Sequence, residues 1–97
     1  MPKGYWIAHV DVTDPEGYKQ YVALNAKAFA KYEAKFLVRG GPFEVKAGKA
    51  RARHVVLEFK DYATALACYE SAEYKAACAV RDKYSSADVI VIEGYEG

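Results

Sequence analysis

The sequence has no long apolar run and no excess of one charge, and each absence excludes a class of protein. No stretch approaches the ~18 consecutive apolar residues of a membrane-spanning helix. The 14 basic and 13 acidic residues leave a net charge of +1, which disfavours the binding of nucleic acid through a broad basic surface. The first four residues lack the apolar core of a signal peptide, so we expect a cytoplasmic protein.

Cysteines and catalytic motifs are also scarce. The two cysteines, Cys68 and Cys78, lie ten residues apart in alanine-rich sequence, a spacing that suits neither a zinc site nor a CxxC redox pair. We expect small core side chains in a reducing cytoplasm, with a disulfide as the alternative. The sequence contains no GxSxG, P-loop, HExxH or GxGxxG motif, and we expect neither a metal nor a cofactor.

Apolar residues, by contrast, are abundant for so short a chain. Of the 97 residues, 53% are apolar and 14% are aromatic. A chain of this length forms one domain, residues 1–97, and buries only about 60–65% of the surface that its unfolded form exposes. Self-association is one way to bury the remaining apolar surface.

Four segments have the alternation or the short apolar run of β-strands. They are residues 4–12, 36–46, 52–60 and 88–93. In the first strand Trp6 and Val10 lie on an apolar face, and His9 lies on a mixed face. The second strand is interrupted at Gly40-Gly41-Pro42, where we expect a bulge, a sheet edge or the close approach of a ligand.

Three helices are predicted to follow the capping residues Asp14, Asp61 and Ser71. The first runs to about residue 34, with an inward face of Tyr18, Val22, Asn25, Phe29, Tyr32 and Phe36. We expect the Asn25 amide to bond neighbouring backbone; the alternative is a contact with a ligand held between helix and sheet. The inward face of the second helix is predicted to carry Tyr62, Ala65, Leu66 and Tyr69. The third covers residues 72–84 and places Arg81 at the rim of its apolar side.

This order of elements predicts an α+β fold of the ferredoxin-like βαββαβ type, in which an antiparallel four-stranded sheet carries helices on one face. The unbroken apolar run from Val89 to Ile92 indicates that both faces of the last strand are buried against other elements. Because helices cover only one face, we expect a second copy to pack sheet to sheet on the other. Ile7, Val56 and either Val89 or Ile90 would meet their counterparts there.

Several short segments, in this order, resemble the family called domain of unknown function 1330. They are Gly4-Tyr5-Trp6, Asp14-Pro15-Glu16, Val38-Arg39-Gly40-Gly41, Val56-Leu57-Glu58-Phe59, Tyr69-Glu70-Ser71, Arg81 and Val91-Ile92-Glu93-Gly94. The resemblance spans nearly the whole chain and implies the dimeric α/β-barrel fold, but no established activity. Members often have tryptophan where this chain has Cys68, so a pocket wall made by that tryptophan is not expected here.

Arg39, with Gly40 and Gly41 beside it, is the first candidate site. A guanidinium offers five donors in a rigid fork, and bare glycine backbone lets a carboxylate approach nearby N–H groups. The alternative is a simple bulge in which Arg39 pairs with Glu58 or Glu93.

Tyr69, Tyr74 and Arg81 form the second candidate site if their helices pack side by side. Phenols and a guanidinium around an apolar hollow would suit a planar organic acid. The alternative is ordinary helix packing, with the hydroxyls reaching solvent. The basic residues of the predicted hairpin are expected to form a solvated surface instead; they are Lys46, Lys49, Arg51 and Arg53.

His9 and His54 are the candidate catalytic residues. His9 shares a strand face with Asp11, and His54 shares one with Glu58, so each imidazole could be oriented by a carboxylate for acid–base work. The alternative is a pair of interface or rim histidines.

These observations favour a small homodimeric protein that binds an aromatic or carboxylate ligand between sheet and helices, with no nucleic-acid or membrane partner. The alternative is an enzyme, because the wider superfamily of the resemblance includes cofactor-free monooxygenases and isomerases. RNA binding comes last: RNA-recognition modules share this order of elements, but residues 53–59 carry a single aromatic, Phe59.

Overall fold

The computed structural model describes residues 2–96, which form four strands and three helices in the predicted order βαββααβ. The strands are Gly4–Val12 (β1), Lys35–Arg39 (β2), Arg53–Phe59 (β3) and Ser85–Glu93 (β4). The helices are Pro15–Lys31 (α1), Tyr62–Glu70 (α2) and Ala72–Tyr84 (α3).

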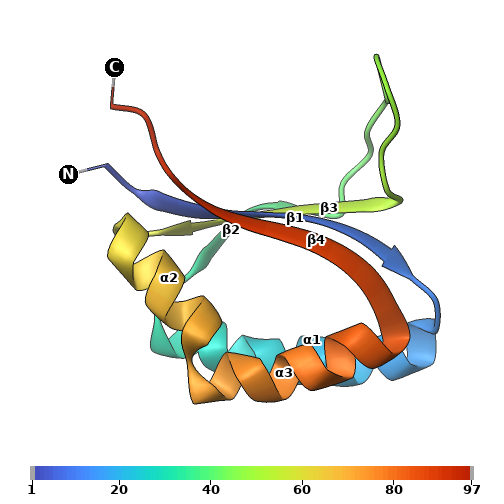
Figure 1. Ribbon diagram of the computed structural model, residues 1–97, viewed down its shortest axis with the longest axis horizontal. Helices are drawn as coiled ribbons and strands as arrows, with labels where there is room; N and C mark the ends of the chain where they lie inside the picture. Colours follow the sequence, from blue (N-terminus) through green and yellow to red (C-terminus); the bar gives the residue numbers. More distant parts are fainter. Residues whose placement is uncertain (1, 97) are drawn as a thin grey trace.

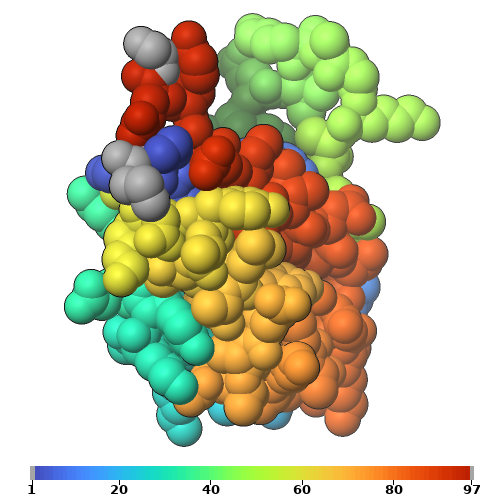
Figure 2. Space-filling view, turned by 60° about the vertical axis from the view of Figure 1, so that its left-hand side comes forward, coloured from blue at the N-terminus to red at the C-terminus, as the bar shows by residue number. Residues whose placement is uncertain are grey.

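The strands form one antiparallel sheet in the order β2-β3-β1-β4, and the helices pack on one of its faces (Figure 1). This arrangement confirms the predicted α+β, ferredoxin-like fold. The other face is open. The segment 40–52 and the C-terminal segment rise from opposite ends of that open face, and Figure 2 shows both standing away from the body of the molecule.

Strand β2 is shorter than predicted because the chain leaves the sheet at Gly40. This residue has a φ of 67°, in the left-handed region, and Pro42 has no N–H to continue a ladder. The prediction that the strand resumes as far as residue 46 is wrong. The bulge lies earlier, at Leu37, since Phe36 faces Leu57 and Val38 faces Val56.

The three predicted helix caps are confirmed. Asp14 accepts a hydrogen bond from the Gly17 N–H at 3.2 Å, and Asp61 accepts one from the Thr64 N–H at 2.7 Å. The Ser71 hydroxyl accepts one from the N–H of Tyr74 at 3.1 Å. These contacts satisfy N–H groups that the first turn of a helix leaves free.

Two predictions about the helices are wrong in detail. Helix α1 ends at Lys31 rather than near residue 34, because Glu33 has a positive φ of 55° that a helix does not accommodate. Tyr62 is exposed instead of inward. A Cβ on Gly4 would lie 2.7 Å from the Tyr62 Cα, so the backbone at the start of α2 packs directly against β1.

Trp6 occupies the centre of the core between the sheet and the helices. It is 1% exposed, and its indole N–H donates to the Ala65 carbonyl at 2.8 Å. Its ring contacts four other aromatic rings with centroids within 5.4 Å; they belong to Phe29, Phe59, Tyr69 and Tyr74. The strand alternation predicted this inward face of β1.

Both cysteines are free, as predicted, and Cys68 is buried while Cys78 is half-buried. Burial, helped by the negative charge of Glu73, raises the pKa of the Cys68 thiol to about 12. In a Cys78→Ser variant at pH 8, we expect a maleimide to label native Cys68 at least about 100-fold more slowly than the urea-unfolded chain, because only the thiolate reacts.

The same pKa shift predicts a dependence of stability on pH. The unfolded thiol ionises near pH 9, so the folded state binds the proton more tightly. The contribution of Cys68 to the free energy of unfolding is therefore present below about pH 9 and is lost as the pH rises towards 12. In the maleimide experiment described above, equal rates of labelling for the native and the unfolded protein would contradict the buried environment of this thiol.

Candidate functional site

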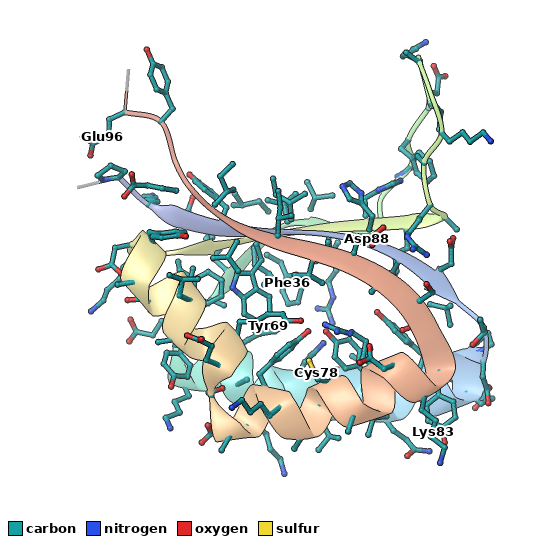
Figure 3. All side chains as sticks on the ribbon, in the orientation of Figure 1. Phe36, Tyr69, Cys78, Lys83, Asp88 and Glu96 are labelled. Atoms are coloured by element: carbon teal, nitrogen blue, oxygen red, sulfur yellow. The ribbon has the colours of Figure 1, made fainter. Side chains whose placement is uncertain are left out.

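A partly open cavity lies between the helix-facing side of the sheet and helices α1 and α3. Its solvent-accessible volume is about 40 Å³, which is room for a few waters or part of a small ligand. Trp6, Phe29 and Phe36 belong to its apolar wall, and Figure 3 shows Phe36 directed into the space between sheet and helices. Its polar lining consists of Tyr18, Tyr21, Asn25, Arg39, Arg53, Tyr74 and Arg81.

The register of β2 and β3 brings two of these arginines to the cavity. Arg39 faces Val55, which lines the cavity, and Arg53 is two residues from Val55 on the same side of β3. The prediction that Arg53 belongs to a solvated hairpin is wrong. The alternation with Val55 and Leu57 was the signal that could have identified it as an inward residue.

Neither of the two adjacent glycines lines the cavity, but Gly40 packs against Arg53, which does. The Gly40 N–H donates to the His54 carbonyl at 2.9 Å, so it is not free for a ligand. A Cβ on Gly40 would lie 2.5 Å from Nη1 of Arg53, whereas a Cβ on Gly41 would meet no atom within 4 Å. The missing side chain of Gly40 therefore makes room for the guanidinium of Arg53.

This difference predicts unequal effects of two neighbouring substitutions. Gly40→Ala is expected to lower the free energy of unfolding by about 1–2 kcal/mol, because alanine at positive φ is strained, and to displace Arg53. Gly41→Ala is the matched control and is expected to change stability by no more than about 0.5 kcal/mol. Urea denaturation measures both, and equal midpoints for the two variants would contradict the role assigned to Gly40.

Arg39 lines the cavity but forms no ion pair with an acidic residue within residues 2–96. Its guanidinium stacks on the ring of Phe36, with 4.3 Å between the guanidinium carbon and the ring centroid. The alternative pairing with Glu58 is not found, since Glu58 accepts from Lys3 at 3.1 Å. Arg39 is exposed at the cavity edge, so its charge is open to a ligand.

Arg81 is buried in the third turn of α3, 8% exposed, and joins the predicted tyrosines in one network. Its Nη1 donates to the hydroxyl oxygens of Tyr69 and Tyr74, each at 3.2 Å. Its Nε donates to Asp82 at 3.1 Å. Tyr74 and Arg81 line the cavity, whereas Tyr69, which was predicted to line it as well, does not and accepts the hydrogen bond from Arg81.

Two tyrosines of α1 extend this network, and sequence reasoning missed both as site residues. The hydroxyls of Tyr21 and Tyr74 lie 2.7 Å apart. The Tyr18 ring packs against that of Tyr21, with 5.2 Å between the centroids, and Tyr18 lines the cavity together with Arg53. Asn25 also lines the cavity. The bond of the Asn25 amide to neighbouring backbone stays a prediction, and its place in the cavity lining puts it where a ligand could meet it.

The phenols of the cavity remain protonated at neutral pH, and the guanidinium of Arg81 remains charged. Burial raises the pKa of Tyr18, of Tyr21 and of Tyr74. Burial alone would lower the pKa of Arg81, but its hydrogen bond to Tyr69 and its other neighbours raise that pKa overall. The cavity therefore offers hydrogen-bond donors at neutral pH.

The donors of the cavity outnumber its acceptors, and Asp, Glu and His are absent from its lining. Nε of Arg53 is buried and has no hydrogen-bond partner within residues 2–96. A buried donor without a partner costs free energy, and an anionic oxygen is the group that best satisfies it. Chemically, the arrangement is able to hold an oxygen-rich anion.

The predicted catalytic histidines lie on the opposite, open face of the sheet. His9 and His54 face each other across β1 and β3, with 2.8 Å between their Nδ1 atoms, so one imidazole donates and the other accepts. The predicted carboxylate partners are engaged elsewhere: Asp11 accepts from Arg51 and from the Ala52 N–H. The imidazole–carboxylate pairs are therefore not formed, and the position of both histidines on the open face agrees with the alternative of interface or rim residues.

A row of aliphatic side chains crosses the open face beside these histidines. The strand register places Val38 opposite Val56, Val56 opposite Ile7, and Ile7 opposite Ile90. Val38 is 43% exposed and Ile90 is 52% exposed. The neighbouring row of His54, His9 and Asp88 is polar. The open face thus has an apolar centre with a polar border, which is the usual anatomy of a protein interface.

Within residues 2–96 there is no cluster of three or more His, Cys, Asp or Glu side chains that could hold a metal ion. No helix of this part of the chain is long and apolar enough to cross a membrane.

Comparison with known proteins gave one family and several solved structures of the same fold. The family model described as Domain of unknown function (DUF1330) matches residues 3–95. No curated protein matches the chain. A protein of unknown function from Rhodopseudomonas palustris has a TM-score of 0.75 and 14% identity, with 99% of this chain and 85% of that chain covered.

Two further solved structures share this fold. The cofactor-independent oxygenase SnoaB from Streptomyces nogalater has a TM-score of 0.65 and 11% identity, covering 100% of this chain and 97% of that chain. A dimeric ferredoxin-like protein of unknown function from Thermobifida fusca has a TM-score of 0.63 and 17% identity, covering 95% of this chain and 91% of that chain. At these identities the similarity shows the fold alone.

Proposed function

This chain belongs to the family of domain of unknown function 1330, and we propose that it binds a small organic acid in the cavity between its sheet and helices. One observation carries the proposal. The cavity lining contains three guanidiniums and no carboxylate, beside an apolar wall of aromatic rings. An anionic head group would pair with the guanidiniums, and a flat apolar body would pack on the rings.

A thermal-shift titration with benzoate and benzamide tests this proposal. Benzoate at 100 times its dissociation constant should stabilise the protein by about 2.7 kcal/mol, whereas isosteric but neutral benzamide should not. Arg53→Met is expected to abolish the shift because it removes the guanidinium with the buried Nε. Lys49→Met, which alters an exposed loop position, is expected to retain it. If benzoate and short aliphatic acids all leave the melting temperature unchanged, the proposal is wrong.

We further propose that the protein acts as a homodimer joined through the open sheet face. The aliphatic row of that face supports this, as do the similar solved structures described as dimeric, from Thermobifida fusca and Bacteroides fragilis. The segment 40–52 and the C-terminal segment rise beside the face and carry exposed Phe43, Val45 and Tyr95, which would clasp a second copy. If sedimentation equilibrium at micromolar concentration gives the mass of a single protomer, the dimer is excluded.

A cofactor-independent oxygenase or isomerase is the second candidate function. The similarity of fold to SnoaB favours it, and guanidiniums beside phenols would stabilise an enolate oxygen. Such chemistry would depend on cavity residues such as Arg53 and Tyr74 rather than on His9 and His54. Oxygen uptake with an enolisable aromatic substrate that survives His9→Ala but not Arg53→Met would support it, and the reverse pattern would exclude it.

Three expectations from the sequence are kept as proposals. These are a single domain over residues 1–97, a cytoplasmic location and the absence of a nucleic-acid partner. The two free cysteines agree with a reducing compartment. The balanced charge of the chain disfavours tight, salt-sensitive binding of RNA.

A further inference from the structure

The cavity carries more positive charge than a single carboxylate can balance. Asp82 pairs with Arg81 at 3.1 Å, but within residues 2–96 neither Arg39 nor Arg53 has an acidic partner. The cost of removing a charge from water applies to Arg53, whose Nε is buried, whereas Arg39 is exposed. Two of the three cavity arginines therefore lack a counter-charge.

These two arginines are neighbours on the helix-facing side of the sheet. Arg39 faces Val55, and Arg53 is two residues from Val55, so the arginines occupy diagonal positions on adjacent strands. The guanidinium of Arg53 reaches the backbone next to Arg39, since Nη1 lies 2.5 Å from the Cβ position of Gly40. Like charges at such positions repel each other, and bound anions would relieve that repulsion.

The donors form an inner group and a group at the cavity edge. In the inner group Arg53 has a buried Nε without a hydrogen-bond partner in residues 2–96, and Tyr18 lines the same cavity. At the edge, exposed Arg39 stacks at 4.3 Å on the Phe36 ring. Phe36 and Phe29, whose ring centroids lie 5.6 Å apart, provide an apolar wall near these groups.

We propose that the ligand is a dicarboxylic acid with a flat apolar body. One carboxylate binds Arg53 and Tyr18 inside the cavity, and the other binds Arg39 at its edge. The body packs against Phe36. This inference rests on the proposed function. It specifies the charge of the ligand and the residues that bind each carboxylate.

Isothermal titration with acids built on one ring tests the proposal. The probes are benzoate, the three benzenedicarboxylates and phenyl phosphate, which concentrates its charge in one head group. At least one dicarboxylate is expected to bind about 10- to 100-fold more tightly than benzoate, because it adds a second charge-assisted pair. Phenyl phosphate is expected to bind less tightly than that dicarboxylate.

Two variants with the same change of net charge locate the second carboxylate. Arg39→Gln is expected to reduce the ratio of dicarboxylate to benzoate affinity to about one. Lys49→Gln, in the exposed loop, is expected to keep the wild-type ratio. Because Arg39 is exposed, the variant should fold, and its circular dichroism spectrum checks this.

Each contrary outcome has a distinct meaning. If benzoate binds as tightly as every dicarboxylate, the proposed function survives and the dicarboxylate inference fails. If phenyl phosphate binds most tightly, the two charges belong on one head group, and the assignment of Arg39 to a second carboxylate is wrong. If no probe binds, the proposed function fails and the inference fails with it.

Discussion

A glutamate in place of Ile90 is expected to convert the proposed homodimer into a folded monomer. Ile90 ends the aliphatic row on the open face and is 52% exposed in the protomer, so a charge there stays hydrated as long as the chain is alone. In a two-fold interface the substitution occurs twice, and each copy buries an unpaired carboxylate at a cost of about 2 kcal/mol or more. The dimer dissociation constant should therefore rise about 1000-fold.

Sedimentation equilibrium measures this change, and circular dichroism checks that the protomer keeps its fold. Ala26→Glu is the matched control, because Ala26 is exposed on α1, on the other side of the sheet. This control adds the same charge and is expected to leave the dimer intact. An Ile90→Glu protein that remains dimeric while an α1 variant dissociates would mean that the helices, and not the open face, form the interface.

Much of the fold could be predicted because its signals are local. The caps Asp14, Asp61 and Ser71 stand immediately before the segments that they cap, and alternation identifies the inward face of a strand without knowledge of its partners. The end of β2 was not predictable in the same way. Glycine and proline at 40–42 indicate a break, but they do not indicate whether the chain returns to the sheet.

The candidate site was predicted less completely, because it depends on how distant strands and helices are aligned. Tyr74 and Arg81 share one helix face, so their proximity follows from helical spacing alone. The contact between His9 and His54 follows from the register of β1 against β3, which nothing within either segment specifies. Arg53 was misassigned because neighbouring basic residues suggested a solvated hairpin, although its own alternation with Val55 indicated an inward position.

Replacing Trp6 by alanine is expected to cause the largest loss of stability among single substitutions in this chain. The side chain is 1% exposed and contacts four aromatic rings, so its removal leaves a cavity that they cannot collapse to fill. Such changes cost about 3–5 kcal/mol, and the Ala65 carbonyl also loses its donor. For a domain of this size the melting temperature should fall by about 15–30 °C.

Two other aromatic substitutions separate the contributions to this loss. Trp6→Phe keeps most of the ring contacts but removes the N–H that donates to the Ala65 carbonyl. We therefore expect it to lower the free energy of unfolding, but by less than Trp6→Ala does. Tyr95→Ala removes a side chain that is 96% exposed and should change stability by no more than about 0.5 kcal/mol. Because Trp6 also lines the cavity, Trp6→Phe should weaken benzoate binding less than Arg53→Met does if the charge of Arg53 holds the acid. A Trp6→Ala protein as stable as the Tyr95→Ala protein would show that the core is not organised around Trp6.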